Sequence, residues 1–325
     1  MKTTSTYHSS QLAFPLAAAL AGLLLSSLPA AAFSIQRSGF SLRVRQDVNP
    51  HAVFSLFALP GEAIPLSIVH SEGVSGPFEV NAPAGRLRTE SPTSWTWTAP
   101  EEEGLQRLRI VQGETGRTMV LNAFVMRRLS PQADEVAGYR LGRYPERPLH
   151  DLSAYRAPQG VVEVTAANRE VRLSPHFTLG QFVCKQGSGW PKFVVLREPL
   201  LLKLEALLEA ANARGWEAET FQVMSGYRTP AYNRGLGNVG FSRHMYGDAA
   251  DVFVDRDGDG RMDDLNQDGK VDKADAAALH DLFAEVEKTP AVAPYLGGIG
   301  IYPATPAHGP YVHVDARGFR ARWGE

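Results

Sequence analysis

The sequence of 325 residues predicts an N-terminal all-β sandwich followed by an α+β domain with a small antiparallel sheet. Short apolar runs of strand length recur between turn residues over residues 33–130. From residue 173 the pattern changes to two amphipathic stretches of helix length, with strand-like runs between and after them. The chain is long enough for two domains of ordinary size.

Composition excludes several classes of protein. Hydrophobic residues make up 44% and charged residues 21%, which fits a globular chain and neither a disordered chain nor a multi-span membrane protein. The net charge of −2 provides no basic field for nucleic acid. The single cysteine, Cys184, rules out a disulfide framework within the chain and a cysteine-rich zinc module, and its apolar surroundings predict a buried thiol.

Residues 1–32 have the pattern of a secretory signal peptide. Lys2 is their only Lys, Arg, Asp or Glu, an apolar stretch covers residues 12–25, and small residues precede a cleavage site after Ala32. An uncleaved membrane anchor is the alternative, which two prolines and the alanine-rich end disfavour. We therefore expect a periplasmic or secreted protein with no stable membrane insertion after cleavage.

Residues 33–130 are the predicted sandwich. Trp95 and Trp97 alternate with threonine and serine, so both rings belong on one face of a strand. Strands of this length and spacing are typical of an antiparallel, immunoglobulin-like sandwich, here without the paired cysteines of antibody domains. We expect a binding or spacer role for this domain. The predicted strands are residues 52–59, 63–69, 94–98, 105–111 and 118–126.

Residues 131–172 are expected to connect the domains and to lie on the second one, because Tyr139, Tyr144 and Tyr155 are too apolar for a free linker.

The α+β domain is expected to cover residues 173–325. Pro199 opens its first helix, residues 200–214, and Gly215 stops it. A second helix follows at residues 273–287. Strands are predicted at residues 221–224, 251–254, 298–302 and 311–314.

Three residues of this domain have the chemistry of a metal site. His244 and Asp251 stand seven residues apart, and Gly247 permits a turn between them. His313 belongs to a run in which residues 311, 313 and 315 share one face of a strand. Two imidazoles and a carboxylate suit catalytic Zn²⁺, which keeps a position open for water. The alternative is three unrelated polar residues.

Three motifs around these residues stand in the order seen in D-alanyl-D-alanine metallopeptidases. They are Ser225-Gly-Tyr-Arg228, Ser242-x-His244-x-x-Gly247-x-Ala249-x-Asp251 and Val312-His313-Val-Asp315. The resemblance covers about residues 173–325 and extends to the group that includes lysostaphin-type enzymes and the hedgehog domain. The segment from Gly297 to Trp323 looks most like the murein L,D-endopeptidase branch.

The resemblance implies His244, Asp251 and His313 as zinc ligands. It also implies Arg228 as the cation that holds a substrate carboxylate or stabilises an oxyanion. Tyr227 and Tyr246, within the same motifs, are further expected substrate-binding residues.

The general base is less clearly marked. Many relatives carry Glu or His three residues before the last ligand, where this sequence has Pro310. Asp315, on the face of His313, is the first candidate for activating the zinc-bound water, and His308 is the second. Asp315 has an alternative role, which is to orient a ligand histidine.

The segment after Asp251 predicts calcium binding by an insert at residues 255–275. Two acidic repeats follow each other at a nine-residue period, each with Gly at the sixth position of a calcium loop. The repeats overlap without a helix between them, so they resemble dockerin-like or thrombospondin-type repeats; a solvated acidic hairpin is the alternative. We expect Ca²⁺ to rigidify the rim of the zinc site. The expected ligands, by side chain or carbonyl, are Asp255, Asp257, Asp259, Arg261, Asp263, Asp264, Asn266, Asp268, Lys270, Asp272 and Asp275.

The favoured interpretation is an exported zinc peptidase that hydrolyses amide bonds in peptidoglycan stem peptides. The sequence leaves open whether it is a carboxypeptidase, a dipeptidase or an endopeptidase, and it leaves the oligomeric state open. Two alternatives belong to other classes. One is an inactive zinc-containing binding module, and the other is a calcium-dependent adhesion protein whose sandwich binds the ligand.

Overall fold

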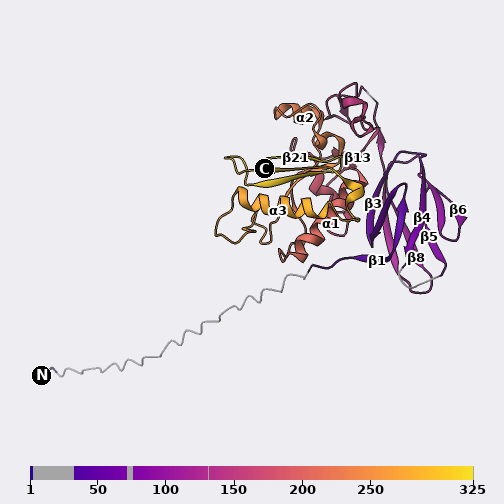
Figure 1. Ribbon diagram of the computed structural model, residues 1–325, viewed down its shortest axis with the longest axis horizontal. Coiled ribbons are helices and arrows are strands. Elements are labelled where there is room, and N and C mark those ends of the chain that lie inside the picture. The colour runs from indigo at the N-terminus through magenta and orange to yellow at the C-terminus, as the bar shows by residue number, and fades with distance from the viewer. Residues whose placement is uncertain (3–32, 72–75, 131, 325) are drawn as a thin grey trace. The chain divides into compact units, whose positions relative to one another are not determined.

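The computed structural model describes residues 1–2, 33–71, 76–130 and 132–324 (Figure 1). The predicted signal peptide, residues 1–32, lies almost entirely outside the described residues. Residues Phe33–Glu325 form one compact unit, distinct from the first 32 residues. Within the described part of the chain, no helix has the length and apolar character needed to cross a bilayer.

Two sheets form the all-β part of this unit. The first is antiparallel throughout, in the order β2-β1-β4-β7-β6. Trp95 and Trp97 are both buried, as their alternation on one strand predicts. The strands of this sheet are β1 (Arg37–Val44), β2 (Asp47–His51), β4 (Ala63–Ser71), β6 (Arg86–Ser91) and β7 (Ser94–Thr98).

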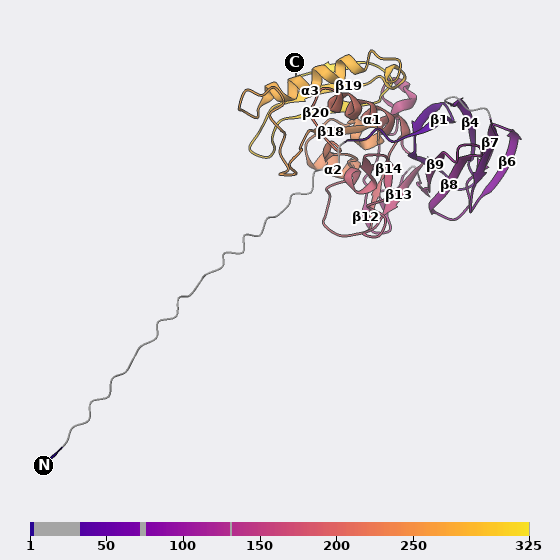
Figure 2. The same cartoon turned by 90° about the horizontal axis from the view of Figure 1, so that it is seen from below.

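The second sheet has the order β3-β9-β8-β5, and its edge strand β3 runs parallel to β9. The prediction of an antiparallel sandwich is therefore wrong at this edge, because alternation marks the buried face of a strand and not its direction. Figure 2 shows the two sheets as separate layers, which share one buried apolar core. The strands are β3 (Val53–Ala58), β5 (Phe78–Asn81), β8 (Gly104–Gln112) and β9 (Thr118–Val125).

The segment that follows the sandwich is more ordered than an extended connection. Its strand β13 (Gly160–Val164) pairs with β10 (Arg127–Arg128) and with β16 (Lys192–Val194). Strand β13 therefore connects the end of the all-β part to the start of the α+β part through backbone hydrogen bonds. Tyr155 is buried against Met245 and Tyr246 of the later domain. The remaining short elements are β11 (Glu135–Val136), β12 (Tyr139–Arg140), η1 (Leu149–Asp151), η2 (Ser153–Tyr155), β14 (Arg172–Ser174), β15 (Phe177–Thr178) and η3 (Leu179–Phe182).

The C-terminal part contains a five-stranded sheet in the order β17-β18-β20-β19-β21. The predicted strands pair antiparallel, but β21 was not predicted and runs parallel to β19, so the sheet is mixed. Its three residues are too few for a periodic signal in the sequence. The strands are β17 (Gln222–Ser225), β18 (Ala249–Phe253), β19 (Gly298–Tyr302), β20 (Tyr311–Asp315) and β21 (Ala321–Trp323).

Two long helices pack with this sheet. Helix α1 (Glu198–Ala213) has Pro in its first turn and is followed by Gly215 in a left-handed conformation, as predicted. Helix α3 (Lys273–Val286) contacts both α1 and strands β19 and β20. The shorter elements are α2 (Pro230–Gly235), η4 (Arg243–Tyr246) and η5 (Ala293–Tyr295).

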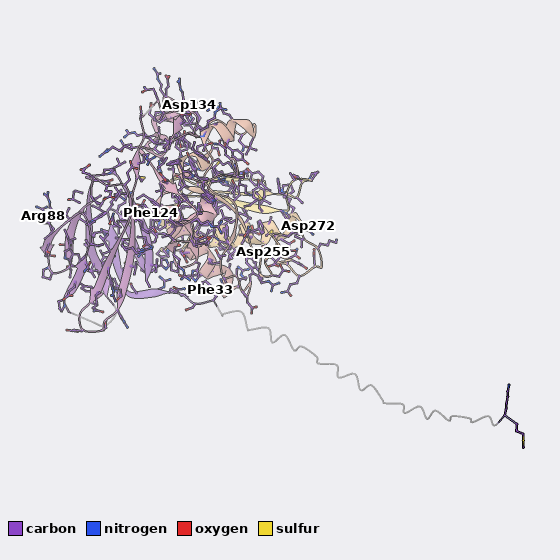
Figure 3. The ribbon with its side chains drawn as sticks, turned by 180° about the vertical axis from the view of Figure 1, so that it is seen from behind. Phe33, Arg88, Phe124, Asp134, Asp255 and Asp272 are labelled. Carbon is purple, nitrogen blue, oxygen red and sulfur yellow. The ribbon has the colours of Figure 1, made fainter. Side chains whose placement is uncertain are left out.

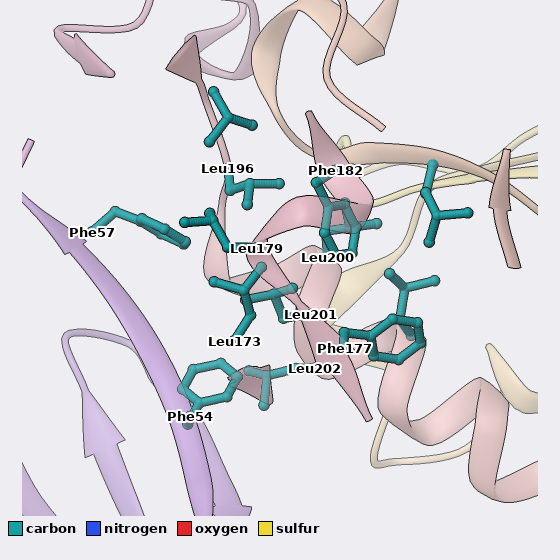
Figure 4. Packing of buried hydrophobic residues seen from close by; sticks show 14 of the residues in the cluster. Phe54, Phe57, Leu173, Phe177, Leu179, Phe182, Leu196, Leu200, Leu201 and Leu202 are labelled. Carbon is teal, nitrogen blue, oxygen red and sulfur yellow. The ribbon is translucent and has the colours of Figure 1, made fainter. Parts of the chain in front are cut away.

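The sandwich and the α+β part share an apolar core. Phe54 and Phe57 of β3 pack near Leu173 and Leu201, and all four side chains are buried (Figure 4). A polar contact lies beside them, where Glu198 of α1 accepts hydrogen bonds from the Phe57 amide at 3.0 Å and from the Arg45 guanidinium at 2.9 Å. The first turn of α1 is therefore joined to the sandwich by both apolar and charged contacts.

Candidate metal centre

His244, Asp251 and His313 converge in the C-terminal sheet. The His244 Nε2 lies 3.1 Å from the His313 Nδ1 and 3.2 Å from the Asp251 Oδ1, and the last two atoms are 2.9 Å apart. Adjacent ligands of a tetrahedral zinc with bonds of 2.0–2.1 Å are separated by about 3.3 Å. The donor set and its spacing therefore fit a zinc ion held by three protein ligands.

Backbone geometry places these ligands. Asp251 and His313 are register partners on the neighbouring strands β18 and β20. His244 comes from η4 and is turned toward them by Gly247, which has φ +75. A Cβ at Gly247 would lie 2.4 Å from the Val195 carbonyl oxygen, so only glycine fits this turn.

Hydrogen bonds set the orientation of both histidine rings. The His244 Nδ1 donates to the Gly226 carbonyl at 2.7 Å, which leaves its Nε2 lone pair facing the other two ligands. In His313 the roles are reversed, since its Nε2 lies 3.0 Å from the Asp315 Oδ2 and its Nδ1 faces the cluster. Both rings thus turn one nitrogen toward the same point, the Nε2 of His244 and the Nδ1 of His313.

Asp315 lies behind His313 and not beside the open side of the cluster. It is completely buried and also bonds the Gly298 amide at 2.8 Å and the Arg317 guanidinium. Because the His313 ring separates it from the converging atoms, this geometry argues against the expected role of general base. It matches the alternative role, in which a carboxylate orients a metal-binding histidine.

Arg228 holds the other carboxylate. Its Nη2 forms an ion pair with the Asp251 Oδ2, and its Nε donates to the Ser225 Oγ at 2.8 Å. The Asp251 Oδ1 is thereby left to face the histidines. Arg228 also lines the adjacent pocket, so its expected contact with substrate is compatible with this second role.

Burial and the neighbouring charges determine ionisation at the cluster. Burial lowers the pKa of His244 and outweighs the attraction of Asp251, so this ring is neutral, as metal ligation requires. Burial raises the pKa of Asp251, but the two histidines more than offset it and hold that pKa well below its usual range. Burial lowers the pKa of His313, yet hydrogen bonds to Asp251 and Asp315 raise it overall. A proton and a metal cation therefore compete for the His313 Nδ1.

A cavity of about 850 Å³ opens over the three ligands. Its wall includes Tyr302 and Tyr311, whose rings stack with centroids 4.6 Å apart. His308 lies at the same wall, with its ring against Tyr311, and its Nδ1 donates to the Gly309 carbonyl at 2.8 Å. This bond leaves the His308 Nε2 as a proton acceptor.

Trp323 of the unpredicted strand β21 completes the wall. Its ring centroid lies 5.1 Å from that of His313, and its indole nitrogen donates to the Tyr302 hydroxyl at 3.0 Å. A Cβ at Gly300 would lie 2.1 Å from the indole, so the glycine on β19 makes room for this ring. Strand β21 therefore supports one of the candidate metal ligands.

Tyr227 and Tyr246 are not among the residues that line the cavity, and their expected role in substrate binding stays a prediction. Both are buried, and the Tyr227 hydroxyl bonds that of Tyr144 at 2.9 Å. Tyr246 packs against Tyr155 and beneath the Arg243 guanidinium. Tyr311 is one wall residue that was missed, although its position on the face of His313 could have identified it.

The acidic insert follows β18 and reaches the surface, where Figure 3 labels Asp255 and Asp272. Asp255, Asp257 and Asp259 can place oxygen atoms within 4.8 Å of one another. Asp255 also accepts bonds from the Gly258 and Gly260 amides at 2.8 and 3.0 Å. The first repeat thus has the compact carboxylate arrangement that the sequence suggests.

Three other expected calcium ligands already have structural partners. Asp275 is buried and accepts bonds from the Leu265 and Asp272 amides, and Asp272 caps helix α3 by accepting from Ala274. Asp263 accepts from the Arg256 backbone amide at 3.0 Å. The remaining expected ligands, Asp264, Asn266 and Asp268, accept hydrogen bonds from amides within their own repeat, such as that of Gly269 to Asp264 at 2.7 Å. Arg261 and Lys270, whose backbone carbonyls were expected to bind calcium, lie in the first and the second repeat.

Comparison with known proteins gives one informative match. A family model described as Peptidase M15 matches residues 175–279, a range that contains His244 and Asp251 and ends before His313. No curated protein matches this chain. Among solved structures, an endo-fucoidan hydrolase from glycoside hydrolase family 107 is 12% identical over 28% of this chain and 15% of that one, with a TM-score of 0.20, which is too low to support an argument. The family match supports a metallopeptidase, and the fold brings His313 to the two ligands that the match contains.

Proposed function

We propose that this protein is a zinc-dependent peptidase that hydrolyses amide bonds in peptidoglycan stem peptides or crosslinks. The observation that carries the proposal is the convergence of the His244 Nε2, Asp251 Oδ1 and His313 Nδ1 beneath an open cavity. The Peptidase M15 match over residues 175–279 supports the reaction class. Export by the N-terminal segment would bring such an enzyme to its substrate.

A zinc ion at this site would lower the pKa of a bound water toward ~7 and polarise the scissile carbonyl. Asp315 orients the His313 ring and Arg228 orients the Asp251 carboxylate, so the open face of the site is kept clear of both. His308, in the cavity wall with a free Nε2, is the general base that takes a proton from the attacking water. The third Arg228 nitrogen, Nη1, forms no bond to a described residue and is available to a substrate oxygen.

The proposal is tested by digesting purified muropeptides and identifying the products by mass spectrometry, with and without a chelator. Hydrolysis that chelator abolishes and Zn²⁺ restores is the expected result. His313→Ala should lose both bound zinc and activity, whereas His150→Ala, at an exposed residue outside the cavity, should lose neither. Activity that survives complete zinc removal would contradict the proposal.

An inactive zinc-binding module is the second candidate, and His308 distinguishes it from an enzyme. Removing a general base typically costs about 10²- to 10⁴-fold in rate. His308→Ala should therefore reduce kcat by at least about 100-fold while zinc content stays unchanged. A wild-type protein that holds zinc and binds muropeptides without cleaving them would favour the module.

We further propose that the acidic insert binds Ca²⁺. The support is the carboxylate cluster of Asp255, Asp257 and Asp259 and the glycine at the sixth position of each repeat. Because the insert follows directly on β18, which carries Asp251, ordering it would stiffen the strand end next to the metal ligands.

A further inference from the structure

The lining of the cavity over the candidate metal ligands contains more cations than carboxylates. The cations in the lining are Lys185, Arg228, Arg243 and Arg317, and its carboxylate is Asp251. A bound zinc ion would add two further positive charges. Such a cavity favours a substrate that carries negative charge.

Three of the four cations already have carboxylate partners. Arg228 pairs with Asp251, Arg243 with Asp248, and Arg317 with Asp315. Each of these aspartates is buried. The arginines are therefore largely committed to holding the protein together around the site.

Lys185 is different, because it is exposed and forms no hydrogen bond or ion pair with any residue in the described parts of the chain. Asp251 is the one carboxylate in the cavity lining, and Arg228 and the two histidines occupy it. The Lys185 ammonium is thus free to meet a charge that arrives with the substrate.

The backbone that carries Lys185 is held firmly. The Lys192 ammonium donates to the carbonyl oxygens of Cys184, Gln186 and Gly187, at 2.9, 3.2 and 2.8 Å. These three carbonyls belong to residues on either side of Lys185 in the sequence. The buried Lys192 ammonium therefore holds the backbone of this loop in place. A fixed backbone reduces the entropy lost when the side chain binds a ligand.

The loop is also tied to the active-site arginine segment. The Gln186 side-chain oxygen accepts a hydrogen bond from the Thr229 hydroxyl at 2.9 Å, and Thr229 directly follows Arg228. A single amide therefore links the neighbour of Lys185 to the neighbour of Arg228. The backbone positions of the two cations are thereby linked across the cavity wall.

From this arrangement we infer that Lys185 determines substrate specificity by pairing with a carboxylate of an acidic peptide, away from the amide that is cleaved. The inference rests on the proposed peptidase function and deepens it, because it selects acidic over neutral or amidated stem peptides. Lys185 contacts the substrate in the bound state and takes no part in the proton transfers.

The test uses the intact purified protein and a panel of synthetic stem peptides, each with one carboxylate converted to an amide. Lys185→Met should raise KM about tenfold for the free-acid peptide, since hydrogen bonds to charged groups contribute more than neutral ones, and should leave kcat within about twofold. For the one peptide whose recognised carboxylate is amidated, wild type and Lys185→Met should have the same KM. Lys185→Arg should retain most of the wild-type KM.

Lys288→Met is the matched control, because it removes an exposed lysine outside the cavity and should leave KM unchanged. Zinc content and melting temperature confirm that each variant is folded. If wild type cleaves the panel and Lys185→Met has the wild-type KM for every peptide, the inference is wrong and the proposed function stands. If wild type cleaves none of the peptides or natural muropeptides, the proposed function fails and the inference fails with it.

Discussion

Asp251 and His313 face each other as register partners across the β18–β20 pair, although 62 residues of chain separate them. Two of the three candidate metal ligands thus belong to a hydrogen-bonded ladder, and the third, His244, comes from a turn. A site built on neighbouring strands keeps its geometry through small movements of the surrounding loops.

Asp315→Asn should weaken zinc binding about 10- to 100-fold, because the variant no longer presents a carboxylate to the His313 Nε2. At saturating zinc the variant should recover most of its kcat. Titration with a competing zinc chelator, followed by assays at saturating zinc, measures both effects. A large loss of kcat that zinc cannot restore would return Asp315 to the role of general base.

Gly247→Ala should lower the free energy of unfolding by at least about 2 kcal/mol, from the left-handed backbone and the contact with the Val195 carbonyl. Gly237→Ala is the matched control, because Gly237 has φ +72 but nothing within 4 Å of its added Cβ. It should cost about 1 kcal/mol from the backbone conformation alone. Urea unfolding of both variants separates the clash from the strain, and equal losses would show that the clash is absent.

Asp47 makes stability depend on pH. Burial, aided by the nearby charge of Glu198, raises the pKa of Asp47 to about 6 from an ordinary value of 3.8. The folded state therefore binds the carboxyl proton of Asp47 more tightly than the unfolded state does. The stability that this protonated carboxyl contributes is fully present below pH about 4 and is lost as pH rises through about 6. Asp47→Asn should raise the free energy of unfolding by about 1 kcal/mol at pH 7.5. This is less than the whole pKa shift would imply, because the carboxylate is partly solvated. Urea unfolding at pH 4.5 and 7.5 checks this, and a variant without any gain at pH 7.5 would contradict it.

Lys203 and Glu287 are a completely buried ion pair at 2.5 Å, and Lys203 also donates to the Asp315 carbonyl at 2.7 Å. Glu287→Gln alone should lower the free energy of unfolding by about 3–5 kcal/mol, because it leaves the buried Lys203 ammonium without its carboxylate. Lys203→Met alone should lower it by less, because Glu287 keeps its ion pair with Arg322. The double variant should cost less than the sum of the two. Denaturant unfolding of the complete cycle measures the coupling, and additive losses would show that the pair does not act as a unit.

Calcium should raise the melting temperature of chelator-treated protein to which zinc has been restored. Asp257→Asn should reduce that rise, because it removes a charged oxygen from the carboxylate cluster. Asp134→Asn, outside the insert, should respond to calcium as wild type does. A melting temperature and an activity that calcium leaves unchanged would refute the calcium proposal.

Periodicity and short motifs predicted much of this architecture. The strands around Trp95 and Trp97, the helix that Pro199 opens, and the strand that carries His313 all follow from local patterns of apolar residues. Local patterns could not predict that strand β3 runs parallel to β9. The direction of a strand relative to its partner depends on the path of the chain between the two strands, which here are far apart in sequence.

At the site, residue type and spacing were enough to select His244, Asp251 and His313 together. They could not tell which ring nitrogen of His313 faces the metal, and that choice decides the role of Asp315. Nor could they show that Tyr227 and Tyr246 turn into the protein, since both stand in the same motifs as residues that line the cavity. These outcomes depend on packing between segments far apart in sequence.

The apolar contact between β3 and helix α1 constrains how the chain acquires its fold. Phe54 and Phe57 are synthesised about 140 residues before the leucines near position 200 that cover them. Until α1 arrives, the sandwich presents an uncovered aromatic face, which is the kind of surface that aggregates or engages a chaperone. The N-terminal part is therefore a dependent folding partner of the α+β part, and cutting the chain between them would expose apolar surface on both pieces.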